Sequence, residues 1–174
     1  VKHRLGLGSQ QDYGFVRDFV GTLYDNGVRV FVVHARNAIL GGLSPKQNRE
    51  IPPLRYDLAA QLCDDFPQAQ FILNGGLSTV AEVSEHGQPF AGVMIGRAAW
   101  HTPKVLSEMH RHFWPEMPLL DDEAIFMRMR QYCIEQLEQG VGIRKLVQPL
   151  LGWAHGRRGA RQWRRYLTDH RVLE

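Results

Sequence analysis

Short apolar runs alternate with amphipathic stretches over the first two thirds of the chain. The runs are continuous and partly β-branched, which is typical of strands buried on both faces of a parallel sheet. Each run is followed by a stretch with helical periodicity. The expected strands span residues 1–7, 28–35, 70–73 and 92–95, and the expected helices span residues 13–26, 56–66, 79–86 and 103–113. This order predicts an α/β domain of four βα units over residues 1–113.

The pattern changes at Trp114, where a proline-containing segment ends the alternation. The acidic residues at positions 121–123 form a favourable helix start, and only helical patterns follow. The expected helices span residues 123–139, 143–155 and 160–169, with glycines between them. We therefore predict a second, small all-helical domain over residues 114–174.

Composition narrows the class of protein. The chain has 174 residues, of which 44% are hydrophobic and 22% are charged, as in an ordinary globular protein. No apolar run is long enough to cross a bilayer, and no signal peptide is visible. The two cysteines, Cys63 and Cys133, are too few for a disulfide scaffold and lack metal-ligand spacing. The sequence therefore predicts a cytoplasmic protein with no membrane span and no metal. The chain begins inside a patterned element and without Met, so we expect it to be part of something larger.

The distribution of charge is more informative than the net charge of +3. Arginines crowd into the last 18 residues with few acidic residues between them: Arg157, Arg158, Arg161, Arg164, Arg165 and Arg171. Such a cluster predicts a local electropositive face that binds nucleic acid. Charge patterning alone also fits a solvated helix face.

Two glycine motifs follow the last two expected strands. Asn74, Gly75 and Gly76 follow the third strand, and Gly96 and Arg97 follow the fourth. Each motif alone also fits a tight turn. Taken as a pair, they match the phosphate site of (β/α)8 barrels, where backbone N–H groups and a guanidinium bind an anion.

Cations also lie near the ends of the first two expected strands. Lys2 is on one face of the first strand, and His34 and Arg36 share a face at the end of the second. A solvent-facing strand or a structural histidine would account for them, but a substrate or cofactor contact fits a barrel mouth. The loop that follows is long for a βα connection, and Lys46 and Arg49 are its charged residues.

These residues together resemble the tRNA-dihydrouridine synthases, and the long loop looks like that of their A subfamily. The similarity covers essentially the whole chain. The matching stretches are KHRLGL (2–7), VHARNAILGGLSPKQNREIPPLRY (33–56), FILNGGL (71–77), GVMIGRAAW (92–100) and GARQWRRYL (159–167).

The resemblance implies a TIM (β/α)8 barrel with FMN at its C-terminal mouth and an all-helical domain behind it. Its members reduce uridine to 5,6-dihydrouridine in the D-loop of tRNA with NADPH, in the A subfamily at positions 20 and 20a. The implied flavin contacts are Lys2 and His34 near the ring system, and Asn74, Gly75, Gly76, Gly96 and Arg97 at the FMN phosphate. The implied substrate and tRNA contacts are Arg36, Lys46, Arg49, Arg161, Arg164 and Arg165.

The resemblance also implies what this chain lacks. A full barrel takes about 250 residues, so four βα units are the C-terminal half of one. In the family the earlier half supplies the catalytic cysteine that protonates the uracil ring, and neither cysteine here matches its motif. We therefore expect little activity from this chain alone, and self-association through the open barrel edges. An RNA-binding fragment without activity, and another FMN barrel that acts on a small molecule, are the alternatives.

Overall fold

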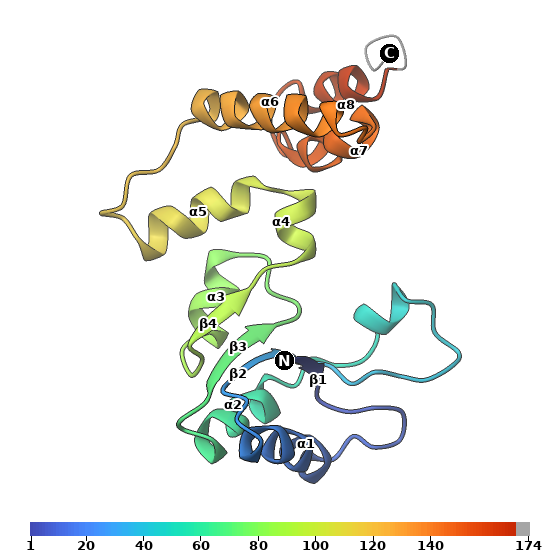
Figure 1. The fold of residues 1–174 in the computed structure, drawn as a ribbon, viewed down its shortest axis with the longest axis vertical. Helices are drawn as coiled ribbons and strands as arrows, with labels where there is room; N and C mark the ends of the chain where they lie inside the picture. The colour runs from blue at the N-terminus through green and yellow to red at the C-terminus, as the bar shows by residue number, and fades with distance from the viewer. Residues whose placement is uncertain (170–174) are drawn as a thin grey trace. The chain divides into compact units, whose positions relative to one another are not determined.

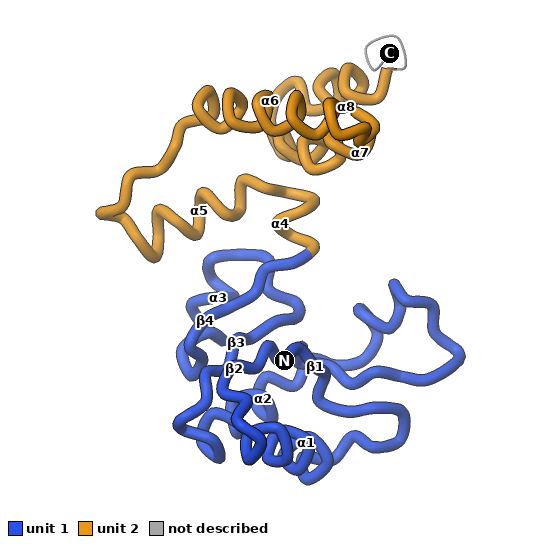
Figure 2. Tube along the Cα trace, in the orientation of Figure 1, with its two compact units in different colours: residues 1–96 blue, residues 97–174 orange. Residues whose placement is uncertain are grey.

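A computed structural model describes residues 1–169, so Arg171 lies outside the described residues. The chain forms two compact units, residues 1–96 and residues 97–174, shown in separate colours in Figure 2. The expected helix over residues 103–113 belongs to the second of these units. Each unit is described by itself below.

The first unit is built on a four-stranded parallel sheet with the strand order β1-β2-β3-β4 (Figure 1). The strands are β1 (Lys2–Arg4), β2 (Val30–His34), β3 (Gln70–Asn74) and β4 (Gly92–Met94). The predicted alternation of parallel strands and helices is thus confirmed, and it is consistent with part of a TIM barrel. The first strand is shorter than expected, because beyond it Leu7 makes only isolated bridges to Gln10 and Ala38.

Three helices connect these strands: α1 (Tyr13–Asp25), α2 (Tyr56–Asp65) and α3 (Val80–His86). Asp12 caps α1 by accepting a hydrogen bond from the Phe15 amide at 3.0 Å. Thr79 and Glu82 form a capping box at the start of α3. The long loop between β2 and α2 contains one 3-10 turn, η1 (Gln47–Arg49).

The two faces of the sheet differ in burial. Phe31, Val33, Phe71 and Leu73 are fully or almost fully buried, and the rings of Phe31 and Phe71 stack 5.3 Å apart. The residues that alternate with them point to the opposite face, where Val30 and Met94 are 45% and 37% exposed. The first face therefore faces the core, and the second is a more open surface.

As far as residue 169, the second unit contains helices and no strand. It contains α4 (Arg97–His101), α5 (Lys104–Phe113), α6 (Asp122–Glu138), α7 (Ile143–Leu146), η2 (Gln148–Gly152) and α8 (Ala160–Thr168). The prediction of one continuous helix over residues 143–155 is wrong. Pro149 has no N–H group to donate to a preceding carbonyl, and the chain forms the short helix α7, a 3-10 turn and further turns there.

Three partly buried aromatic rings of this unit lie against one another. Phe126 of α6 lies 5.1 Å from the ring of Trp153 and 5.6 Å from the ring of Trp163, measured between centroids. Lys104 forms an ion pair with Asp122 and lies 4.5 Å above the Trp153 ring. Within residues 1–169, no helix has the length and apolar character that a bilayer crossing requires.

Candidate functional site

Polar side chains gather where the strands of the first unit end. The register of the sheet aligns Arg4, His34, Asn74 and Met94, so these side chains share the open face. Lys2 Nζ donates a hydrogen bond to Asn74 Oδ1 at 3.3 Å, and Asn74 Nδ2 donates to the Met94 carbonyl at 2.8 Å. Asn74 thereby links a cation of β1 to the end of β4.

The loop after β3 requires glycine for two reasons. Gly75 and Gly76 have φ angles of +111° and +75°, which side chains rarely adopt. A Cβ on Gly75 would lie 3.3 Å from the His34 ring, and one on Gly76 would lie 2.5 Å from Leu54 and 2.8 Å from the Tyr56 hydroxyl. The same hydroxyl donates a hydrogen bond to the Gly75 carbonyl at 2.7 Å. The loop is therefore packed closely against His34 and the start of α2.

Gly96 faces open space, in contrast to the glycines after β3. A Cβ added there would meet no atom within 4 Å, and the residue is exposed. Because Asn74 and Met94 are register partners, the loops that leave β3 and β4 start side by side. Five of the predicted residues thus lie at one sheet edge: Lys2, His34, Asn74, Gly75 and Gly76, with Gly96 following β4. Arg97 begins α4 and belongs to the second unit.

A carboxylate occupies the start of α3. Glu82 Oε2 accepts hydrogen bonds from the Ser78 amide and hydroxyl, both at 2.8 Å, and from the Thr79 amide at 2.9 Å. Partial burial acts to raise the pKa of Glu82, but these hydrogen bonds outweigh it and lower the pKa below its ordinary value. The negative charge of Glu82 therefore disfavours an anion at the start of α3.

Two arginines hold the long loop after β2 onto the sheet. Arg4 Nη1 donates to the carbonyls of Asn37 at 2.9 Å and Asn48 at 2.8 Å. Arg36 Nη1 donates to the carbonyls of Glu50 at 3.2 Å and Pro52. The sequence indicated Arg36 as a substrate contact and assigned Arg4 no role, because backbone carbonyl acceptors have no sequence signature. Both guanidinium groups contact the loop backbone.

The remaining predicted cations lie on exposed surfaces of both units. Lys46 and Arg49 are exposed on the long loop of the first unit, at and beside η1. Arg161, Arg164 and Arg165 are exposed on α8 of the second unit. Each unit therefore offers positive charge to solvent.

Neither cysteine is in an activating environment. Burial raises the pKa of Cys63 to about 11, with a contribution from nearby Asp64, and its Sγ lies 3.9 Å from the Ala59 carbonyl. Burial also raises the pKa of Cys133 on α6. Both thiols are therefore protonated at neutral pH. In the part of the chain that the structure describes, no group of three or more His, Cys, Asp or Glu side chains could hold a metal ion.

Comparison with known proteins decides the family. The profile of the family described as dihydrouridine synthase matches residues 1–173. The chain belongs to the dihydrouridine synthase family. This family is in general flavin-dependent.

Several relatives are similar over nearly the whole chain. The tRNA-dihydrouridine(20/20a) synthase of Pseudomonas putida is 44% identical over 177 residues, which cover 100% of this chain and 53% of that protein. The protein of the same name from Pseudomonas syringae pv. tomato is 44% identical, over 97% of this chain and 50% of its own length. The one from Pasteurella multocida is 41% identical, over 98% and 52%. The chain thus spans about half the length of these relatives.

Proposed function

We propose that this chain is the flavin-phosphate-binding and RNA-binding part of a tRNA-dihydrouridine synthase. The reaction is the reduction of uridine to 5,6-dihydrouridine at positions 20 and 20a of the tRNA D-loop, with NADPH as the source of hydride. The observation that carries the proposal is the set of glycines and cations at the carboxyl edge of the sheet. The names of the relatives support the choice of RNA substrate.

Lys2, His34 and residues 74–76 fit a bound FMN. Because Gly75 has no side chain, its backbone can lie close to the His34 ring. A side chain at Gly96 would meet no other atom, so the space around this residue is open. Lys2 is exposed and reaches Asn74 at this edge, where its charge would stabilise the reduced, anionic flavin. Gly75, Gly76, Gly96 and Arg97 would bind the FMN phosphate. When bound, the flavin supplies the reducing chemistry.

The RNA contacts in this proposal come from exposed cations on both units. Lys46 and Arg49 belong to the long loop that Arg4 and Arg36 anchor to the sheet. Arg36 would therefore act on the substrate indirectly, by positioning this loop. Arg161, Arg164 and Arg165 on α8 would bind phosphates. Cys63 lies within α2 and Cys133 within α6, not in the loops that follow the strands, and we expect little dihydrouridine formation by this chain alone.

The phosphate contact is tested by comparing FMN with riboflavin, which has the same ring system and no phosphate. Isothermal titration of the chain should show FMN binding at least about 10-fold more tightly, since hydrogen bonds to a charged group contribute about 1.5–3 kcal/mol. Gly96→Ala should remove most of this difference and leave stability almost unchanged, because its Cβ meets nothing in the free protein. Equal affinities for the two flavins would show that no phosphate site exists here.

A further inference from the structure

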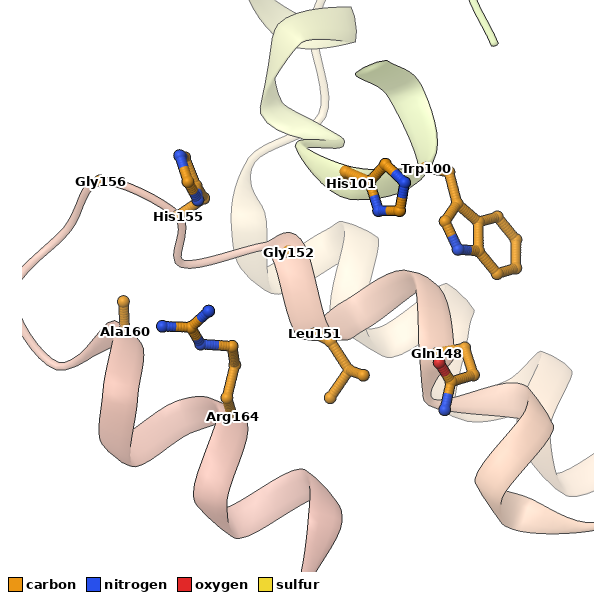
Figure 3. Close-up of a pocket in the computed structure, with 9 residues that line it drawn as sticks. All are labelled: Trp100, His101, Gln148, Leu151, Gly152, His155, Gly156, Ala160 and Arg164. Carbon is orange, nitrogen blue, oxygen red and sulfur yellow. The ribbon is translucent and has the colours of Figure 1, made fainter. Parts of the chain in front are cut away.

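The second unit contains a pocket of about 440 Å³. This volume lies within the range of about 300–1,000 Å³ that is usual for small-ligand sites. The pocket is formed by α4, η2, α8 and the turn between the last two, and Figure 3 shows how its side chains lie. Its lining residues are Trp100, His101, Gln148, Leu151, Gly152, His155, Gly156, Ala160 and Arg164.

The walls of this pocket are held in fixed positions by two close contacts. A Cβ on Gly152 would lie only 1.8 Å from the His101 carbonyl oxygen, so η2 touches the backbone of α4 directly. The indole Nε1 of Trp163 donates a hydrogen bond to the Leu150 carbonyl at 2.6 Å, which fixes α8 to η2. The backbone segments that form the pocket are therefore packed directly against one another.

The lining chemistry combines an aromatic face with positive charge. Trp100 is 51% exposed, and Arg164 is exposed on α8. In Figure 3 these two side chains stand at opposite sides of the pocket, with η2 between them and His101 beside Trp100. The lining residues include no carboxylate, and Gln148 adds an amide that can both donate and accept hydrogen bonds. A ligand that matches this arrangement has a flat polar ring and an anionic group.

We propose that this pocket binds an unpaired segment of the RNA, with one base stacked on Trp100 and a backbone phosphate of the same segment on Arg164. The inference rests on the proposed function, because it takes the bound RNA to be the source of this segment. Bases in a duplex are stacked on their neighbours and cannot present a face to a side chain, whereas bases in loops can. The pocket thus selects RNA that has an exposed, unpaired base, as a tRNA loop does.

The test is fluorescence anisotropy of the full chain with three labelled RNAs: an unmodified tRNA transcript, a ten-nucleotide oligouridine and a blunt RNA duplex. Trp100→Ala should weaken binding of the tRNA and the oligouridine about 10-fold or more, which is the scale of one stacked base. Duplex binding should stay the same, and Trp100→Phe should restore most of the loss. Trp114→Ala removes another exposed tryptophan, 55% exposed and outside the pocket, and should have no such effect.

Arg164→Gln should weaken binding of the tRNA and oligouridine more than Arg158→Gln, which changes an exposed arginine outside the pocket lining. If Trp100→Ala fails to fold by circular dichroism, Gln148→Ala at an exposed position provides the same comparison. Variants that bind tRNA as tightly as the wild type would overturn the pocket and leave RNA binding intact. Equal losses for duplex and oligouridine would also overturn it. A wild-type chain that binds none of the three RNAs would instead refute the proposed function itself.

Discussion

Gly76→Ala tests whether the loop after β3 is packed as closely as the structure indicates. Gly76 has a φ angle of +75°, and placing alanine in this region costs about 1–2 kcal/mol. The new Cβ would also lie 2.5 Å from Leu54 Cδ1 and 2.8 Å from the Tyr56 hydroxyl. The leucine methyl can move aside, but Tyr56 would have to give up its hydrogen bond to Gly75. Such overpacking costs about 1–3 kcal/mol more.

Gly42→Ala is the matched control. Gly42 has nearly the same φ angle, +73°, but a Cβ there would meet nothing within 4 Å. We therefore expect Gly42→Ala to lower the free energy of unfolding by about 1–2 kcal/mol and Gly76→Ala to lower it by about 2–5 kcal/mol. The difference between the two variants isolates the cost of the close contact.

Urea unfolding followed by far-UV circular dichroism measures both variants. All four tryptophans lie between positions 100 and 163, so tryptophan emission reports the second unit separately. In a double-mutant cycle, Tyr56→Phe removes the hydroxyl that Gly76→Ala would strike, and the combined loss should be less than the sum of the single losses. Equal losses for Gly76→Ala and Gly42→Ala, within about 0.5 kcal/mol, would refute the reasoning.

Three further outcomes are expected. The pKa of Glu82 lies below its ordinary value of 4.5, so its contribution to stability is present above that pH and disappears as the pH falls further. In the Glu82→Gln variant, the difference between the urea midpoints at pH 6 and pH 3 should therefore be smaller than in the wild type. An unchanged difference would contradict this. Cys63, whose pKa burial raises to about 11, should react slowly with a disulfide reagent at pH 8 and faster as the pH approaches 11, whereas rapid modification at pH 7 would count against its burial. Sedimentation velocity should show self-association of the wild-type chain through the open sheet face. Met94→Lys on that face should reduce the self-association, whereas Met127→Lys, at an exposed position on α6, should not. A monomeric wild type would exclude it.

The two central strands of the sheet could be predicted because each coincides with a short run of apolar or β-branched residues. Val30–His34 and Gln70–Asn74 are β-branched or apolar runs between turn residues, and their burial on the helix-covered face required that pattern. Helix α4 was not predicted, because five residues are too few to show helical periodicity. The continuous helix expected over residues 143–155 was predicted but does not form. The apolar spacing favoured a helix there, and the prediction gave too little weight to Pro149, which interrupts it.

The candidate site was predictable in its residue types but not in its contacts. Paired glycines after a strand indicated an anion site, and their positive φ angles and close packing agree with the need for glycine. The link from Lys2 to Asn74 depends on strand register, which the sequence does not contain. The pocket beside Trp100 depends on the approach of Gly152 to His101, two residues 51 positions apart, and Gly152 lies in the 3-10 turn η2, which was not predicted.

The manner in which the long loop is attached affects how freely its exposed residues can change. Arg4 and Arg36 grip it mainly through main-chain oxygens of Asn37, Asn48, Glu50 and Pro52, which every amino acid possesses. Of the loop side chains, Asn48 also takes part, bonding the Ile39 amide and carbonyl at 3.0 and 2.5 Å. Positions such as Lys46 and Arg49 can therefore be exchanged while the scaffold beneath them keeps its shape. Libraries that vary these outward positions and preserve both arginines should therefore retain the folded loop.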